Sequence, residues 1–305
     1  MKPEISVIVP VYNDRMGVEV TLKSLVKQDV PVGKYEIIVA DNGSDDGTQE
    51  IVKNYAERHQ ELIKLVIEDK IQSSYAARNM GIKHAKGNIL CFLDADMWVE
   101  KDYISKAADI FKSPDVKYLG CNVEVITSSD TLIEKHHKAT GFPVKRDIQH
   151  QHYAPTCCVI VRRDVFDKAG LFDERLISGE DLEFGNRVFE AGYKQFYAED
   201  ILLYHPACKS LKKQIKRHFR YGRGRFQLSY FYPEKYQKVF YPSYRLTPKL
   251  FLRSVFLKTR KLLFIFAPSK KEKIQFALLE NIYKLSQRCG FLYEKKQKNK
   301  KKNDN

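Results

Sequence analysis

Residues 89–96 read Ile-Leu-Cys-Phe-Leu-Asp-Ala-Asp, an apolar run followed at once by two aspartates one residue apart. A short aliphatic run of this kind predicts a buried β-strand with a polar turn at its carboxyl end. Two earlier runs have the same form: Ile5–Val11 leads into the polar residues 12–14, and 35–40 leads into 41–44. We therefore expect three strands whose ends place polar side chains near one another.

Amphipathic helical patterns separate these strands, at residues 18–26, 48–58 and 74–85, and Ile63–Ile67 is a further predicted strand. Connections of this length join parallel strands by crossover helices. The predicted fold class is α/β, a Rossmann-like and mostly parallel sheet flanked by helices. In such sheets the ligand lies beyond the carboxyl ends of the strands.

The middle of the chain is less regular. The elements expected there are a helix after Glu100, a strand at 118–125, a long loop reaching 150, a strand at 157–161, a helix at 180–191, and a last strand at 196–204 ending at His205. Beyond residue 206 basic and aromatic residues dominate, and we expect a mainly helical extension. The Lys- and Asn-rich residues 295–305 are expected to be disordered.

Charge is divided unevenly along the 305 residues, of which 43% are hydrophobic and 30% charged, as in globular proteins. The net charge is +15. Residues 206–305 hold 27 Lys and Arg against 5 Asp and Glu, a net charge of +22, whereas residues 1–205 carry about −7. The acidic part suits a metal and neutral sugars. The basic part suits phosphates, whether of nucleotides, lipid head groups or nucleic acid.

The six cysteines form no CxxC pair, and the adjacent Cys157 and Cys158 could bridge only with severe strain. This excludes a disulfide framework and favours a reducing compartment. The first residues lack the features of a secretory signal, so we expect a cytoplasmic protein. No run of 18 uncharged apolar residues occurs, but residues 250–267 alternate apolar side chains with four cations. That segment is either a helix lying in a membrane interface or an ordinary docking helix.

Two of the strand ends carry groups suited to ligand binding. Asp94 and Asp96 could hold Mg²⁺ or Mn²⁺, which prefer oxygen ligands, although two aspartates after a strand are often only a turn. Residues 41–48 read Asp-Asn-Gly-Ser-Asp-Asp-Gly-Thr. They are either a loop before a capped helix or, through Asp41, a contact to a base or ribose.

Together these motifs resemble the family 2 glycosyltransferases, nucleotide-sugar enzymes of the GT-A fold. The resemblance covers residues 4–205 and rests on five ordered motifs, at 7–13, 36–48, 77–81, 94–96 and 179–181. It implies a nucleotide-sugar half at 1–97 and an acceptor half at 98–205. A basic and membrane-associated region would follow at 206–294.

The resemblance implies a nucleotide site. Pro10, Tyr12 and Asp41 would frame the base, usually uracil, and Arg78 would help hold the nucleotide. Asn42 stands where relatives more often have a second aspartate, which leaves the contacts to the base open.

The resemblance also implies a metal site. Asp94 would lie near the ribose and the metal, and Asp96 would bind the divalent cation, Mn²⁺ or Mg²⁺, directly. His205 matches a position where relatives place a histidine near the metal and the diphosphate. Its alternative is a residue at a helix boundary.

Glu180 and Asp181 are the candidate catalytic pair. Ser178 to Asp181 also fits a helix capping box, and both interpretations can hold together. Glycosyl transfer needs a base to take the proton of the attacking hydroxyl. By resemblance Asp181 is that base, and Glu180 binds acceptor hydroxyls.

The basic segment 217–225 contains two glycines, which suggest a mobile loop whose arginines, Arg220 and Arg223, close over the diphosphate. The alternative is a solvated basic helix. Some processive relatives carry an Arg-Trp motif at a comparable place, and here Tyr221 follows Arg220. A polymerising synthase is therefore not expected.

The function expected from the sequence is an inverting, metal-dependent transfer of a sugar, most often from a UDP-sugar, to a glycan or lipid-linked acceptor of the cell envelope. The enzyme would work on the inner face of the cell membrane, at an anionic surface and without nucleic acid. One alternative is a nucleotidyltransferase on a similar sheet. Another is a nucleic-acid-binding protein that uses the basic third.

Overall fold

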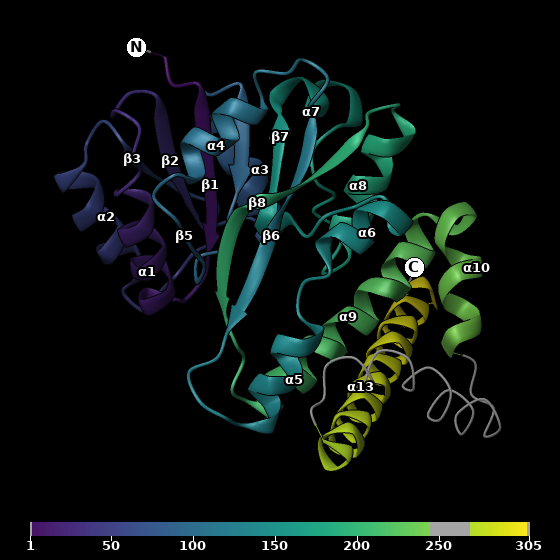
Figure 1. Cartoon of the computed structure of the whole chain (residues 1–305). Coiled ribbons are helices and arrows are strands. Elements are labelled where there is room, and N and C mark those ends of the chain that lie inside the picture. The colour runs from purple at the N-terminus through teal and green to yellow at the C-terminus, as the bar shows by residue number, and fades with distance from the viewer. Residues whose placement is uncertain (1, 245–268, 304–305) are drawn as a thin grey trace. The chain divides into compact units, whose positions relative to one another are not determined.

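The computed structural model describes residues 2–244 and 269–303 (Figure 1). The chain forms two compact units. The sheet unit comprises Met1–Ile126, Phe142–Glu174 and Glu180–Pro206, and the helical unit comprises Thr127–Gly141, Arg175–Gly179 and Ala207–Asn305. The sheet unit ends one residue beyond the domain boundary expected from the sequence. Two short segments that were expected in the first domain belong to the helical unit.

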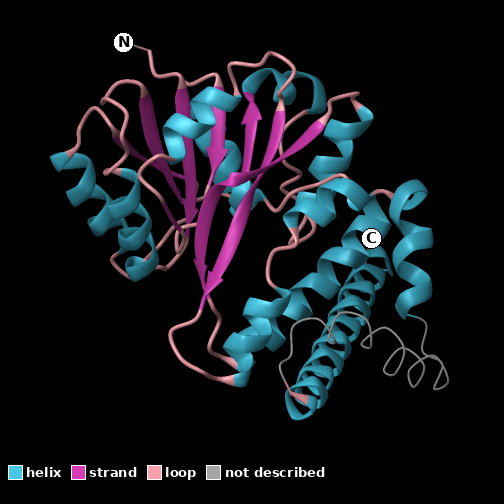
Figure 2. Cartoon of the chain, viewed as in Figure 1, coloured by secondary structure: helices cyan, strands magenta, loops and turns pink. Residues whose placement is uncertain are grey.

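A mixed sheet of eight strands forms the centre of the sheet unit, counted over the described residues, in the order β3-β2-β1-β4-β7-β6-β8-β5 (Figure 2). Strands β1 to β4 are mutually parallel, as are β6 and β8, whereas β7 and β5 run antiparallel to their neighbours. The strands are β1 (Ile5–Val11), β2 (Tyr35–Asp41), β3 (Ile63–Ile67), β4 (Ile89–Phe92), β5 (Trp98–Val99), β6 (Tyr118–Ile126), β7 (Val159–Arg162) and β8 (Gln195–Pro206). This confirms the predicted α/β class.

The helices of the sheet unit are α1 (Arg15–Leu25), α2 (Thr48–Arg58), α3 (Ser74–His84), α4 (Tyr103–Ile110), α6 (Val144–Gln151), α7 (Arg163–Ala169) and α8 (Glu180–Glu190). Helices α1, α2 and α3 form the predicted crossovers, α4 and α8 were also expected, and α6 and α7 were not predicted. Every residue of β1 and β2 is buried, as expected for parallel strands covered on both faces. In the register of the sheet Val11 lies opposite Asp41, and Ile8 lies opposite Phe92. The ends of β1, β2 and β4 therefore meet at one edge, where the sequence predicts ligand binding.

Three local expectations were wrong. Residues 127–150 are not a long loop, because they contain α5 (Leu132–Thr140) and α6. The strand expected at 157–161 starts only at Val159, after a 3₁₀ turn at Thr156–Cys158. The last strand continues through His205 to Pro206, so His205 is a strand residue and does not mark a helix boundary.

The described residues of the helical unit form α5, α9 (Leu211–Phe231), α10 (Pro233–Tyr244) and α13 (Lys270–Asn303). Helices α9 and α13 approach backbone to backbone: a Cβ on Gly222 would lie 1.8 Å from the carbonyl oxygen of Gln287, and one on Gly290 would lie 2.0 Å from that of Phe219. The absence of a side chain at Gly222 and Gly290 permits this contact. Gly222 therefore serves helix packing, Gly224 lies against the backbone of Ser178, and both are part of α9, so the expected mobile loop is wrong.

Two further expectations concern the carboxyl-terminal part. Helix α13 runs to Asn303, so most of the tail expected to be disordered is helical. The apolar segment 250–267 lies outside the described residues. Within 2–244 and 269–303, no helix combines the length and the apolar character required to span a bilayer. All six cysteines are free thiols.

Candidate active site

Two loops at the strand ends are tied together by side-chain hydrogen bonds. Asn13 follows β1 with a φ of 49°, in the left-handed region that asparagine tolerates better than most residues. Its Nδ2 donates to Asp45 Oδ1 at 2.9 Å, and the backbone N–H of Asp45 donates to Asn13 Oδ1 at 3.0 Å. The loops after β1 and β2 therefore form one rigid wall.

Asp41 lies at the end of β2 and is completely buried. Its Oδ1 accepts hydrogen bonds from the backbone N–H groups of Gly43 and Ser44, at 3.0 and 2.9 Å, and from Gln49 Nε2 at 2.8 Å. Oδ2 has no partner among the described residues. A buried acceptor without a donor is costly, so Oδ2 is well suited to an N–H group of a bound base. Gln49 gave no signal in the sequence.

The neighbouring candidates differ in exposure. Pro10 is buried within β1, whereas the ring of Tyr12 is 51% exposed and can cover a planar ligand. Asn42 is buried, and its Nδ2 donates to the carbonyl oxygens of Glu68 and Ile71, each at 2.8 Å. The asparagine therefore holds the next loop in place. This explains why an amide, which can donate, stands there in place of a carboxylate.

The two aspartates after β4 lie on a turn that α1 supports. Thr21 Oγ1 donates to the carbonyl oxygen of Met97 at 2.6 Å. Asp94 accepts a 2.7 Å hydrogen bond from Arg78 at Oδ1, and both aspartate side chains remain more than a third exposed. The turn is therefore fixed while the carboxylates stay accessible to a ligand. Thr21 could not be identified from sequence, because an isolated threonine in a helix has many roles.

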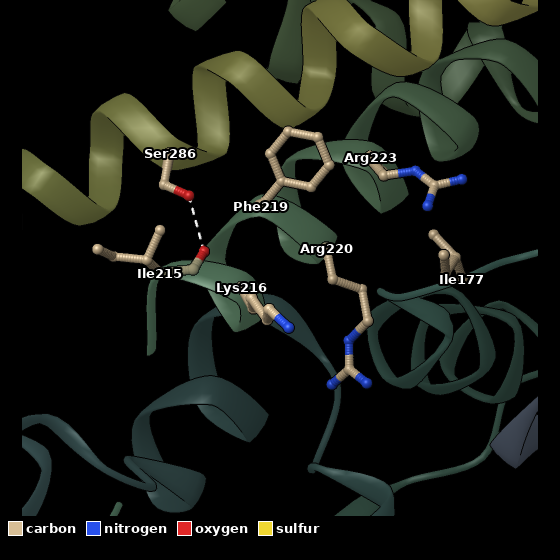
Figure 3. A pocket seen from close by; sticks show the side chains of 7 residues that line it. All are labelled: Ile177, Ile215, Lys216, Phe219, Arg220, Arg223 and Ser286. Atoms are coloured by element: carbon tan, nitrogen blue, oxygen red, sulfur yellow. Dashed lines mark hydrogen bonds between the residues drawn. The ribbon is translucent and has the colours of Figure 1, made fainter. Parts of the chain in front are cut away.

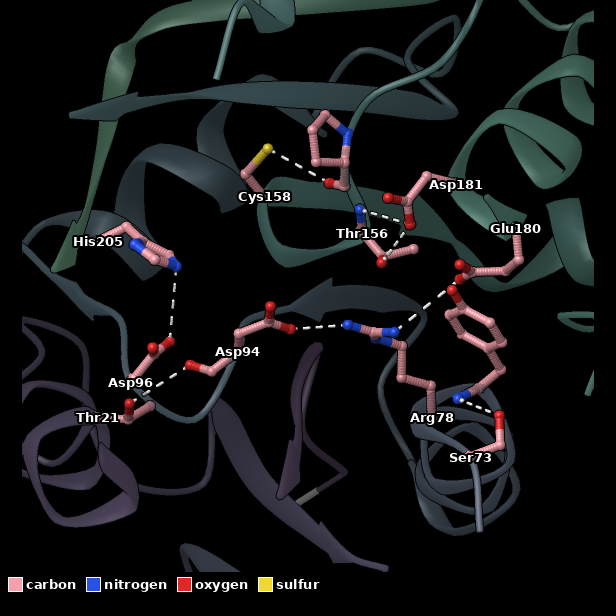
Figure 4. A network of polar contacts seen from close by, with 12 residues as sticks. Thr21, Ser73, Arg78, Asp94, Asp96, Thr156, Cys158, Glu180, Asp181 and His205 are labelled. Carbon is pink, nitrogen blue, oxygen red and sulfur yellow. Dashed lines mark hydrogen bonds and ion pairs between the residues drawn. The ribbon is translucent and has the colours of Figure 1, made fainter. Parts of the chain in front are cut away.

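Strand β5, which begins two residues after Asp96, pairs with β8, and this pairing brings His205 beside Asp96 (Figure 4). His205 Nε2 lies 3.9 Å from Asp96 Oδ1. The other ring nitrogen, Nδ1, lies 2.7 Å from the carbonyl oxygen of Pro206, which favours the tautomer with the proton on Nδ1. Nε2 then presents a lone pair beside a carboxylate, a pair of groups that fits a divalent cation.

The described part of the chain contains no group of three or more His, Cys, Asp and Glu side chains arranged as a complete metal site. Ions such as Mg²⁺ are commonly held by one or two protein ligands together with substrate phosphates. Asp96 and His205 therefore fit a site that a donor diphosphate would complete.

Arg78, from α3, connects Asp94 with the candidate catalytic pair. Its side chain is 5% exposed, and its NH1 lies 3.9 Å from Glu180 Oε1. Burial opposes the charge and lowers the pKa of Arg78, but the carboxylates of Asp94 and Glu180 outweigh this and raise the pKa above its usual value. Arg78 is therefore a fixed cation between two acidic groups.

Glu180 and Asp181 begin α8 and differ sharply in environment. Glu180 is fully buried. Burial, followed by the charge of Asp181, raises the pKa of Glu180 well above its usual value, whereas Arg78 lowers it. In this structure Glu180 faces Arg78 and is not exposed to solvent, so its contact with an acceptor remains a prediction.

Asp181 is partly exposed and is held by a residue that the sequence did not indicate. Its Oδ1 accepts hydrogen bonds from Thr156 Oγ1 at 2.6 Å and from the Thr156 backbone N–H at 3.2 Å. Thr156 lies in the 3₁₀ turn before β7, 25 residues away in sequence. Thr156 therefore fixes the orientation of the Asp181 carboxylate.

Arg220 and Arg223 belong to the helical unit, on α9. Arg223 Nε donates to Glu294 Oε2 at 2.7 Å. The solvated-helix alternative fits these arginines better than the mobile loop does. Their contact with a diphosphate stays a prediction.

Comparison with known proteins identifies the family. The model described as Glycosyl transferase family 2 matches residues 6–170, and that described as Glycosyl transferase family group 2 matches residues 89–279. The chain belongs to glycosyl transferase family 2. Glycosyltransferase AglE of Haloferax volcanii is 36% identical over 227 residues, 74% of each protein. This family 2 chain is therefore a glycosyltransferase, an enzyme that moves a sugar from a nucleotide sugar to a glycan acceptor.

More distant proteins agree with the family. A Methanococcus voltae transferase is 25% identical over 249 residues, 75% of this chain and 77% of its own length, and its name specifies a dolichyl N-acetyl-α-D-glucosaminyl phosphate acceptor. The mannosyltransferase PcManGT of Pyrobaculum calidifontis, solved with GDP-Man and Mn²⁺, superposes with a TM-score of 0.66 at 20% identity, over 97% of this chain and 88% of its own. The structural likeness establishes the GT-A fold of this family 2 enzyme.

Proposed function

We propose that this glycosyltransferase is a metal-dependent, inverting enzyme that uses a nucleotide sugar, with UDP as the favoured nucleotide. The observation that carries the proposal is the polar network of Figure 4, in which one buried arginine lies between the carboxylate of Asp94 and that of Glu180. Asp94 belongs to the expected donor side and Glu180 adjoins the expected base. In this proposal the guanidinium of Arg78 therefore holds one residue of the donor site and one residue beside the base.

Asp181 acts as the general base. Thr156 holds Oδ1, so Oδ2 takes the proton of the acceptor hydroxyl as that oxygen attacks the anomeric carbon. The bond between the anomeric carbon and the donor phosphate breaks in the same step, and the nucleoside diphosphate leaves. A single displacement of this kind inverts the anomeric centre, so an α-linked donor gives a β-linked product.

Asp96 and His205 would hold the divalent cation, with Asp94 beside it. A bound Mn²⁺ or Mg²⁺ supplies Lewis-acid stabilisation of the charge that develops on the leaving diphosphate. Asp41 Oδ2 would accept a hydrogen bond from the base of the nucleotide. Uracil offers one ring N–H as a donor, and guanine offers additional donors. The relatives solved with GDP-Man and with UDP-GlcNAc show that this fold serves both nucleotides in those proteins.

The acceptor proposed is a glycan or lipid-linked sugar of the cell envelope. The Methanococcus voltae relative, whose named acceptor is a dolichyl-linked sugar phosphate, supports a lipid-linked acceptor by analogy.

A donor panel tests the enzymatic proposal. UDP-, GDP- and dTDP-sugars are offered with Mn²⁺, and thermal shift and sugar release are measured. We expect UDP-sugars to raise the unfolding temperature and to release sugar. Both effects should disappear after chelation of the metal and in Asp96→Ala. Proton NMR of the transferred product should show the inverted anomer. Full activity of Asp96→Ala in chelator would refute metal dependence, and a retained anomer would refute the single displacement.

We further infer that the enzyme lies on the inner face of an anionic membrane. Helix α13 presents an apolar stripe to solvent, with side chains 40–64% exposed, formed by Ile274, Leu278, Ile282, Leu285 and Leu292. Their spacing of three, four or seven residues places them on one helix face. Lys270, Lys271, Lys284 and Arg288 share this helix. Apolar side chains together with cations suit an anionic lipid surface.

Liposome sedimentation tests the location. The full chain should sediment with phosphatidylglycerol vesicles and much less with phosphatidylcholine vesicles. Replacing Leu278, Ile282 and Leu285 with Ser should reduce the bound fraction, whereas the same change at Val239, an exposed apolar residue of α10, should not. Equal recovery of the parent in the supernatant with and without anionic lipid would contradict the inference.

A further inference from the structure

The helical unit contains a cavity of about 430 Å³ that has no role in the proposed transfer of a sugar (Figure 3). This volume falls within the range usual for small-molecule sites. One face of α9 forms most of its wall, and the residues lining it are Ile177, Ile215, Lys216, Phe219, Arg220, Arg223 and Ser286.

The cavity wall combines two kinds of surface. Ile177, Ile215 and Phe219 supply apolar area, and none of the described residues that line the cavity is acidic. The Ser286 hydroxyl donates to the carbonyl oxygen of Ile215 at 2.7 Å, so that hydroxyl already serves to join α13 to α9. The cavity is therefore basic and apolar.

The three cationic side chains of the wall differ in whether they form an ion pair. Arg223 is paired with Glu294, whose side chain is 7% exposed. Lys216 and Arg220 are exposed and have no carboxylate partner in the described ranges 2–244 and 269–303. They lie four residues apart, and like charges at that spacing destabilise a helix. In Figure 3 both side chains extend to the same side of α9. An anion bound between them would relieve their repulsion.

We propose that this cavity binds a phosphate group that carries an alkyl chain. Lys216 and Arg220 bind the phosphate oxygens, and Ile177, Ile215 and Phe219 contact the first carbons of the chain. Arginine and lysine are the usual phosphate ligands, and the adjacent apolar wall distinguishes a phosphate amphiphile from free phosphate. Ile177 precedes Glu180 by three residues in the sequence.

This inference rests on the proposed function, because the phosphate of a lipid-linked acceptor is one source of such a ligand. The head group of a membrane phospholipid is the other. Both present a phosphate ester beside an alkyl chain, and the test separates them.

Calorimetric titration of the full chain with dodecyl phosphate, below its critical micelle concentration, measures the binding. The expected affinity is at least about tenfold higher than for inorganic phosphate or dodecyl maltoside, a difference of about 1.4 kcal/mol. The double variant K216Q/R220Q should lose at least about tenfold, since each cation contributes a charge-assisted hydrogen bond. Lys212→Gln, on the same helix but outside the cavity, should bind as the parent does, and thermal unfolding should show that both variants fold.

Three results would overturn the proposal: equal binding of dodecyl phosphate and inorganic phosphate, parental binding by K216Q/R220Q, or displacement of dodecyl phosphate by saturating UDP. Displacement by UDP would indicate that Lys216 and Arg220 bind the diphosphate of the donor. Phosphatidylglycerol vesicles then identify the source. A parallel loss of vesicle binding in K216Q/R220Q indicates a membrane lipid, and unchanged vesicle binding indicates a lipid-linked acceptor.

Failure here is distinguishable from failure of the proposed function. The thermal shift with Mn²⁺ and nucleotide, and its loss in Asp96→Ala, depend on the sheet unit. A parent that shows that shift and ignores dodecyl phosphate refutes the cavity assignment alone. A parent that binds dodecyl phosphate but shows no shift with any nucleotide refutes the proposed donor site alone.

Discussion

Replacing Arg78 by Met tests whether this arginine organises the site. Met fills a similar volume without charge, so the change removes the 2.7 Å hydrogen bond to Asp94 and the cation 3.9 Å from Glu180. A hydrogen bond to a charged group contributes about 1.5–3 kcal/mol, and the 39% exposure of the Asp94 side chain favours the lower half of that range. Glu180 is buried with its pKa already raised, so it can take a proton once the cation is gone.

The expected loss for Arg78→Met is therefore about 2 kcal/mol, below the 3–5 kcal/mol typical when one partner of a fully buried pair is removed. Urea unfolding at pH 7 measures it, with Asp94→Asn and the double variant completing a cycle. The coupling energy should be about 1 kcal/mol or more, and nucleotide affinity should fall in both single variants. Additive effects within about 0.5 kcal/mol, together with unchanged nucleotide affinity, would refute the organising role of Arg78.

Three further changes test other parts of the site and its support. Asp181→Asn keeps the size of the side chain but cannot take a proton, so transfer should fall about 10²-fold or more while nucleotide binding survives; near-parental turnover would place the base elsewhere. Because the pKa of Glu180 is raised in the folded chain, the folded state holds more protons, and the free energy of unfolding should decrease as the pH rises above about 4.5. Glu180→Gln should flatten that decrease in urea unfolding between pH 5 and 8, and an unchanged slope would contradict the assignment. Gly222→Ala places a Cβ against the Gln287 carbonyl and should cost about 1–3 kcal/mol, whereas Lys212→Ala, exposed on the same helix, should cost little; equal stability of the two variants would contradict the close helix contact.

The features predicted well from sequence are those that depend on local pattern. Ile5–Val11 and Thr48–Arg58 are observed with the predicted bounds, since a continuous apolar run and a 3.6-residue period each specify one element. Helix α5 was missed because its polar sequence, Leu-Ile-Glu-Lys-His-His-Lys-Ala-Thr, resembles a loop. Its first turn is ordered instead by hydrogen bonds from Ser128, Ser129 and Thr131 to the side chain of Glu134.

The acidic residues of the site could be chosen from sequence because they follow strands or begin a helix. Their partners could not. Thr156 lies 25 residues from Asp181, and Arg78 lies 16 residues from Asp94. The family motif predicts a contact of Arg78 to the nucleotide, which stays a prediction, and gave no indication of its contacts to two carboxylates. Long-range pairings of this kind depend on strand order, which no local pattern encodes.

The anchoring of Asp181 by Thr156 has a consequence for the product. In the proposed mechanism Asp181 is the base, and Thr156 occupies its Oδ1 with two hydrogen bonds, so the proton of the acceptor goes to Oδ2. An acceptor sugar offers several hydroxyls of similar acidity, and only the hydroxyl whose proton meets Oδ2 while its oxygen faces the anomeric carbon can react. Under this proposal Thr156, through its hold on Asp181, takes part in deciding which carbon of the acceptor carries the new glycosidic bond. Regioselectivity of the linkage is then partly encoded in the turn before β7.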